Sequence, residues 1–188
     1  MTKKALVLLA EGFEEVEAIT PIDYLRRAGV EVTIAAIGKS KTVKGSRGME
    51  LNSDAFLADL LRKGTASSFD ALVLPGGSLG AENLAASKEA GDLLKEEAAK
   101  GKLICAICAS PVVVLAPLGM LKGKKFTCNP GVEKEVQDAV LSHDRVVTDG
   151  NIITSRAAGT AGNFAAAIIA ELVNRAEAEK LAKSVMLI

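Results

Sequence analysis

The chain has 188 residues, 49% of them hydrophobic, with 17 glycines and with 23 basic residues balanced by 23 acidic ones. A chain of this size most simply forms one domain, taken here as 1–188, and its composition suits a close-packed α/β protein. Because the charges are interspersed and only 3% of the residues are aromatic, neither nucleic acid nor an anionic membrane surface is an expected partner.

The chain opens with a short apolar run, KALVLLA, that ends one residue before Glu11. This run is too short for a signal peptide, and no later stretch approaches the roughly 20 apolar residues of a membrane span. The predicted elements, in chain order, are a strand at 4–10, a helix at 14–28, a strand at 30–37, a hairpin at 41–51, a helix at 55–62 capped by Asp54, a strand at 71–74, a helix at 84–100, a strand at 102–107, a short helix from about Ala109, a hairpin at 145–155 and a helix at 160–182.

Nearly continuous apolar strands that alternate with helices predict a doubly wound sandwich, a mostly parallel sheet with helices on both faces. In such a sheet, ligands bind beyond the carboxyl ends of the strands. Four loops should therefore meet at the functional edge, namely 11–17, 75–80, 108–111 and 156–160.

The stretch LICAICASPVVVLA holds Cys105 and Cys108 at the spacing of a redox pair. Side chains alternate along a strand, so the two thiols should lie on opposite faces unless the chain turns sharply between them. A zinc site needs about four ligands, and the other candidates, Cys128 and the lone His143, are not at ligand spacing. We therefore expect neither a disulfide nor a metal, and the odd number of cysteines favours a reducing, cytoplasmic setting.

Cys108 stands where the strand ends and a helix begins, among small residues, which is the pattern of a nucleophile elbow. The N–H groups at a helix start should favour the thiolate and lower the pKa of Cys108. The alternative is that Cys108 is one more small buried residue, and this stretch alone leaves both interpretations open. We expect Cys105 to be core, Cys128 to be a bystander and His143 to be exposed.

The nearest candidate for proton transfer is Glu17 in the segment EGFEEVEA, since Glu14 and Glu15 are ordinary complements of a helix dipole. Pro21 lies four residues beyond Glu17 and should distort the helix there. A charged Glu17 would raise the pKa of a neighbouring thiol, so the partner of a thiolate should be a protonated Glu17.

The loop LPGGSLG matches no phosphate-binding motif. Its glycines permit positive φ and let backbone N–H groups approach a ligand. The N–H of Gly77, together with that of Ala109, could therefore form an oxyanion hole.

In combination these motifs resemble the DJ-1/ThiJ/PfpI superfamily, and specifically its parkinsonism-associated glyoxalase and deglycase branch. The similarity runs nearly end to end and is carried by ALVLLAEGFEEVEAITPIDYLRRAG, SRGMEL, DALVLPGGSLGAENL, AAKGKLICAICASPVVVLA and IITSRAAGT. It implies one flavodoxin-like domain without a cofactor. The residues it implies are Cys108 as nucleophile, Glu17 as its carboxyl partner, backbone donors at Gly77 and Ala109 with Gly76 beside them, and Arg27 and Arg47 near the site and the contact of a homodimer.

The chain departs from the family pattern in one respect. Some members carry a histidine before a proline near the thiol, where this chain has Asn129, which cannot shuttle protons at neutral pH. Proton transfer should then rest on Glu17 alone. The protease and amidotransferase branches need a histidine that this chain lacks, since Ala109 follows the nucleophile.

Two functions remain open from the sequence. The first is a glutathione-independent glyoxalase or protein deglycase that acts on methylglyoxal, glyoxal or their early protein adducts. The alternative is a redox sensor or stress chaperone, because a reactive exposed thiol is also what peroxide oxidises. Both need Cys108, so the sequence does not choose between them.

Overall fold

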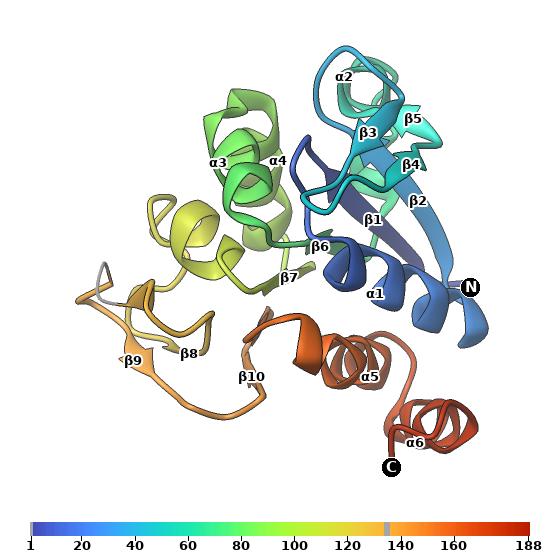
Figure 1. The fold of residues 1–188 in the computed structure, drawn as a ribbon, viewed down its shortest axis with the longest axis vertical. Coiled ribbons are helices and arrows are strands. Elements are labelled where there is room, and N and C mark those ends of the chain that lie inside the picture. Colours follow the sequence, from blue (N-terminus) through green and yellow to red (C-terminus); the bar gives the residue numbers. More distant parts are fainter. Residues whose placement is uncertain (1, 134–135) are drawn as a thin grey trace.

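The computed structural model describes residues 2–133 and 136–188, and a seven-stranded sheet runs through the middle of the molecule (Figure 1). The strands follow the order β10-β11-β7-β6-β1-β2-β5, and every neighbouring pair is parallel except β10 with β11. The bounds are β1 Lys4–Leu9, β2 Glu31–Ala36, β5 Ala55–Phe56, β6 Ala71–Leu74, β7 Leu103–Ile107, β10 Val146–Asp149 and β11 Ile152–Ser155. The predicted parallel sheet is confirmed.

Helices cover both faces of this sheet, as the flavodoxin-like expectation requires. The helices α1 Glu15–Arg27, α5 Ala161–Leu172 and α6 Arg175–Ser184 lie on one face, and α2 Leu57–Arg62, α3 Ser78–Ala86 and α4 Lys88–Ala99 lie on the other. The side chains of β1 alternate between the two cores: Leu6 and Leu8 pack on the face of α3 and α4, whereas Val7 and Leu9 pack on the face of α1 and α5. None of the described helices is long and apolar enough to cross a bilayer.

The order of the strands decides where a ligand can bind. From the central strand β1 the chain first adds β2 on one side and later adds β6 on the other. The loops that follow β1 and β6 therefore leave the sheet in opposite directions and open a crevice at their carboxyl ends. The smaller elements lie outside this sheet: the hairpin β3 Thr42–Lys44 with β4 Glu50–Asn52, and the pair β8 Lys125–Phe126 with β9 Val140–Leu141.

Two predicted helices are each divided in two. The segment predicted as one helix at 84–100 is α3, which begins earlier at Ser78, followed by α4. Between them, Ser87 is extended (φ −79°, ψ 106°) and its Oγ accepts the N–H of Ala90 at 3.2 Å. In the predicted helix 160–182, Asn174 similarly caps α6 by accepting the N–H of Glu177 at 2.9 Å. Both residues are strong N-cap formers that end one helix and start the next.

The prediction that Asp54 caps a helix is wrong. Its Oδ2 accepts the N–H of Ile34 at 2.8 Å, which fastens the start of β5 to β2, and α2 begins only at Leu57 without a side-chain cap. The short helix expected from Ala109 is a π-helical turn at Pro111–Leu115. Helix α1 continues without interruption through Pro21.

The core of the α1/α5 face allows a test of the fold. Phe164 on α5 is fully buried there, so Phe164→Ala should lower the free energy of unfolding by about 3–5 kcal/mol through lost burial and a cavity. Val140→Ala, at a residue that is 61% exposed, should change the free energy of unfolding by less than about 0.5 kcal/mol. Urea denaturation of both variants measures the difference, and equal stability would contradict the packing described.

Candidate active site

Cys108 lies at a sharp turn directly after β7, in a backbone conformation rare for a side-chain-bearing residue. Its φ is 67°, and among the described residues only Met186 shares a positive φ without being glycine. The turn is held from both sides, since the N–H of Cys108 donates to the carbonyl of Ser155 at 3.0 Å and its carbonyl accepts the N–H of Asn129 at 2.8 Å. Such a conformation costs about 1–3 kcal/mol and persists only where the surroundings impose it.

The three cysteines differ sharply in accessibility. Cys105 is fully buried and Cys128 is 3% exposed, whereas Cys108 is only partly buried and lines a cavity. All three are free thiols. Burial raises the pKa of Cys105 and, to about 11, that of Cys128. Cys108 is thus the thiol that a solute can reach.

The carboxyl of Glu17 approaches this thiol from α1. Glu14 caps the helix by accepting the N–H of Glu17 at 2.8 Å, and the Glu17 side chain, 1% exposed, turns inward. Its Oε2 accepts the N–H of Gly76 at 3.0 Å, and the carboxyl also contacts the N–H of Ala158 and the thiol of Cys108. The buried carboxyl therefore has one hydrogen bond, to the N–H of Gly76, and lies close to the N–H of Ala158 and to the thiol.

Gly76 makes this contact possible because it has no side chain. An ideal Cβ built on Gly76 would lie 2.5 Å from Oε2 of Glu17, 2.5 Å from Cβ of Cys108 and 3.0 Å from the carbonyl oxygen of Ile107. The loop after β6 therefore packs tightly between the Glu17 carboxyl and the turn at Cys108, and this position has no space for a side chain. The neighbouring Gly77 has φ 90°, which a residue with a side chain rarely adopts.

Burial controls the ionisation of both groups. It raises the pKa of Glu17 to about 7, and the contact with Cys108 and the N–H groups of Gly76 and Ala158 only partly oppose the rise. Burial, followed by the charge of Glu17 and the hydrogen bond with it, raises the pKa of Cys108 to about 12.

The expected thiolate is therefore not the state that this arrangement favours. Only the N–H groups of Gly77 and Ala109 act on Cys108 in the predicted direction, by lowering its pKa. Desolvation and an ionised Glu17 outweigh them, because each penalises a second negative charge in a dry site. The pKa of Glu17 stays below that of Cys108, so the arrangement favours a neutral thiol beside the carboxyl.

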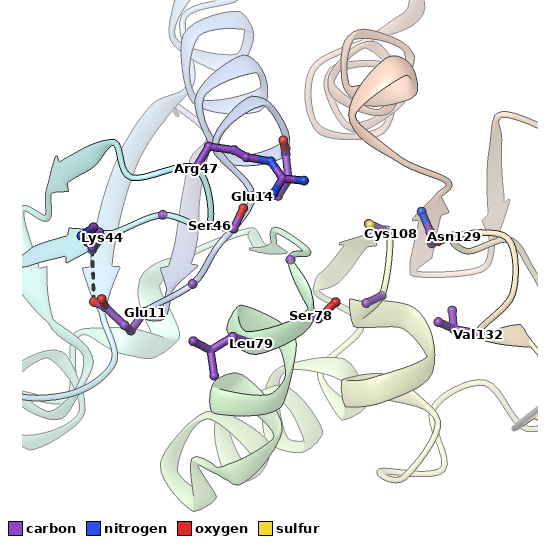
Figure 2. A pocket seen from close by; sticks show the side chains of 14 residues that line it. Glu11, Glu14, Lys44, Ser46, Arg47, Ser78, Leu79, Cys108, Asn129 and Val132 are labelled. Atoms are coloured by element: carbon purple, nitrogen blue, oxygen red, sulfur yellow. Dashed lines mark hydrogen bonds between the residues drawn. The ribbon is translucent and has the colours of Figure 1, made fainter.

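A cavity of about 550 Å³ lies in front of the thiol (Figure 2). Cys108 and Asn129 lie at one end, and Glu11, Lys44 and Leu79 lie at the other. The lining residues are Glu11, Gly12, Glu14, Lys44, Gly45, Ser46, Arg47, Gly77, Ser78, Leu79, Cys108, Ala109, Asn129 and Val132. The loops after β1, β6 and β7 thus meet at one site, together with the hairpin loop between β3 and β4.

Of the two arginines predicted to lie near the site, only one does. Arg47 lines the cavity, whereas Arg27 lies at the opposite end of α1 from Glu17, where its Nε donates to Asp23 at 2.7 Å. Ten residues of helix span about 15 Å, so Arg27 does not reach the cavity of its own chain.

Glu15 has a role that the sequence analysis missed. Glu15 is 3% exposed, and its carboxylate accepts the N–H of Arg47 at 2.7 Å, the hydroxyl of Ser46 at 3.2 Å and the N–H of Met49 at 3.4 Å. Burial acts to raise the pKa of Glu15, but these hydrogen bonds outweigh it and the pKa is lowered. Glu15 therefore fixes the hairpin loop that forms one wall of the cavity. The N–H of Ala158, a second missed contact, comes from a loop that was correctly assigned to this edge of the sheet.

Within 2–133 and 136–188, no group of three or more His, Cys, Asp or Glu side chains is arranged to hold a metal ion. The lone His143 takes part in the structure through its backbone, whose carbonyl accepts the guanidinium of Arg156 at 2.8 Å.

The fold and this site define a class: parallel flavodoxin-like α/β proteins with a cysteine at a strained strand–helix turn and a buried carboxyl against it. The chain belongs to the DJ-1/PfpI family, whose model matches residues 3–171.

Similar proteins cover nearly the whole chain. Protein DJ-1 homolog A of Arabidopsis thaliana is 43% identical over 98% of this chain, which spans only 46% of that relative. The glutathione-independent glyoxalase DJR-1.2 of Caenorhabditis elegans is 35% identical over 98% of this chain and 97% of its own. The crystal structure of Drosophila melanogaster DJ-1beta matches with a TM-score of 0.92 at 42% identity, over 99% of this chain and 98% of that one.

Gly76 supplies a test of the site's geometry. Gly76→Ala should lower the free energy of unfolding by about 1–3 kcal/mol, because the added methyl group must displace Cys108 or Glu17. The matched control is Gly91→Ala on α4, where a Cβ meets nothing closer than 3.5 Å and helix propensity favours alanine. Urea denaturation of both is the measurement, and a Gly76→Ala protein as stable as the control would show that thiol and carboxyl are not packed across Gly76.

Proposed function

We propose that this protein is a cofactor-independent glyoxalase that converts small 2-oxoaldehydes, such as methylglyoxal and glyoxal, into 2-hydroxy acids through Cys108. The observation that carries the proposal is a carboxyl with a pKa of about 7 in contact with an accessible thiol. A general base is most effective when its pKa lies near the working pH. The similarity to a relative named as a glutathione-independent glyoxalase supports the same activity.

In the first step the Cys108 sulfur attacks the aldehyde carbon while Glu17 takes the thiol proton. This order suits a neutral thiol beside a carboxylate, because no free thiolate has to form in a desolvated site. The oxygen of the former aldehyde gains negative charge as the carbon–sulfur bond forms. The N–H groups of Gly77 and Ala109, which act on the same sulfur, are available to stabilise that charge. The protonated Glu17 then returns its proton to this oxygen, which gives a hemithioacetal.

In the second step Glu17 removes the hydrogen of the former aldehyde carbon as a proton, which gives an enediolate, and returns that proton to the neighbouring carbonyl carbon. The hydroxyl proton of the hemithioacetal passes to the oxygen of that neighbouring carbon, so a C=O forms at the carbon bonded to sulfur and a hydroxyl at its neighbour. The product of this shift is a thioester of a 2-hydroxy acid on Cys108. Water then cleaves the thioester, releases lactate from methylglyoxal or glycolate from glyoxal, and restores the thiol. One water is consumed per turnover and no electron leaves the substrate, so no redox cofactor is required. Early adducts of the same aldehydes on proteins carry a related carbon centre and are included in the proposed substrate class.

The proposed working unit is a homodimer in the cytoplasm. Val16 and Ile19 lie three residues apart on α1 and are 47% and 42% exposed, and Met49 on the hairpin loop is 60% exposed. The backbone of Met49 bonds to Glu15 at the start of the same helix. These apolar side chains beside the cavity are the surface that we propose a second copy covers.

The role of Glu17 can be tested by Glu17→Gln. The isosteric amide cannot accept a proton, so lactate formation from methylglyoxal should fall at least about 100-fold. In the unmodified protein, kcat/KM should rise with pH through about 7, because the base acts only when deprotonated, and this limb should be absent in the variant. Alkylation of Cys108 is the control: removal of the carboxylate charge should shift it to lower pH. Undiminished turnover would remove Glu17 from the mechanism.

The second candidate function, redox sensing with an oxidisable cysteine, is favoured by the difference in exposure among the three thiols. Peroxide reaches an accessible sulfur before a buried one, so graded peroxide should convert Cys108 to sulfinic acid at doses that leave Cys105 and Cys128 reduced. Mass spectrometry of peptides from each dose measures the order. Simultaneous oxidation of all three thiols would count against a sensor, and steady lactate formation by the reduced protein favours the enzyme.

A further inference from the structure

The hydroxyl of Ser110 connects the elbow to the glycine loop. Ser110 is fully buried two residues after Cys108, and its Oγ donates to the carbonyl oxygen of Pro75 at 2.6 Å. That distance is at the short end of the range for hydroxyl donors. The bond joins segments 35 residues apart in the chain, the loop after β6 and the turn after β7.

The carbonyl that Ser110 holds belongs to the same peptide unit as the N–H that holds Glu17. The peptide bond between Pro75 and Gly76 is trans and planar, so its C=O and N–H point in opposite directions as one rigid group. On one side the unit accepts the hydroxyl of Ser110 at 2.6 Å, and on the other it donates to Oε2 of Glu17 at 3.0 Å. A hydrogen bond to the oxygen of a peptide also polarises its N–H and strengthens the bond that the N–H makes.

We infer that Ser110 is a positioning residue of this site, an inference that rests on the proposed function. Its hydroxyl fixes the rotation of the Pro75–Gly76 peptide, and the N–H of Gly76 therefore faces the Glu17 carboxylate. Ser110 does not line the cavity, and it acts through this one peptide.

The inference predicts a change in acidity and not only in stability. The Gly76 N–H favours the ionised form of Glu17 and lowers its pKa. Without the hydroxyl, the peptide is free to turn, the bond to the carboxylate weakens, and the pKa of Glu17 rises further above its ordinary value. A hydroxyl that merely satisfies a buried carbonyl would lower the melting temperature of the variant and leave the titration of Glu17 where it was.

The test is a carbon-13 NMR titration of the Glu17 carboxyl, assigned by its loss in Glu17→Gln, in the full chain and in Ser110→Ala. The midpoint should move up by about half a pH unit or more in Ser110→Ala. The matched control is Ser184→Ala on α6, which removes a hydroxyl-to-carbonyl bond of 2.8 Å to Leu181 far from the cavity and should leave the midpoint unchanged. Lactate formation should fall several-fold in kcat with KM within about twofold.

An unchanged midpoint in Ser110→Ala, or an equal shift in Ser184→Ala, would overturn the inference. Should Ser110→Ala fail to fold, Ser110→Cys keeps a side chain of similar shape with a weaker donor and carries the same expectation. The titration needs no turnover, so it decides the role of Ser110 even if the unmodified protein produces no lactate, an outcome that would reject only the proposed function.

Discussion

The contact between the Glu17 carboxyl and the Cys108 thiol is the interaction on which the site depends. Burial raises the pKa of each group, so the pair resists carrying two negative charges near neutral pH. The surrounding structure serves this contact: Glu14 caps the helix that presents the carboxyl, and Gly76 leaves room for the two groups to meet. A parallel sheet supplies the rest, since it brings the three loops that carry these residues to one edge.

Much of the fold could be predicted from the sequence because its signals are local. Apolar runs mark β1, β6 and β7 almost to the residue, and the position of Cys108 between a strand and small residues indicated the elbow. The helix breaks at Ser87 and before Asn174 were missed because good helix formers stand on both sides and hide a capping residue between them.

The other wrong predictions from the sequence concern interactions between segments that are distant in the chain. Asp54 has the sequence context of a helix cap, but its carboxylate instead accepts the N–H of Ile34 in β2, twenty residues away in the chain. Glu15 has the sequence context of a residue that complements the helix dipole, but its carboxylate binds the N–H of Arg47 in the hairpin loop. The sign of the shift in Cys108 acidity was wrong because burial has no local signature, whereas the helix start that opposes it has one.

The left-handed backbone at Cys108 means that the fold and the chemistry prefer different residues at one position. With φ at 67°, glycine could adopt this backbone without the torsional strain that cysteine carries, so the backbone conformation alone favours glycine over cysteine at this position. A chain that made no use of this thiol would therefore escape the backbone strain by carrying glycine here.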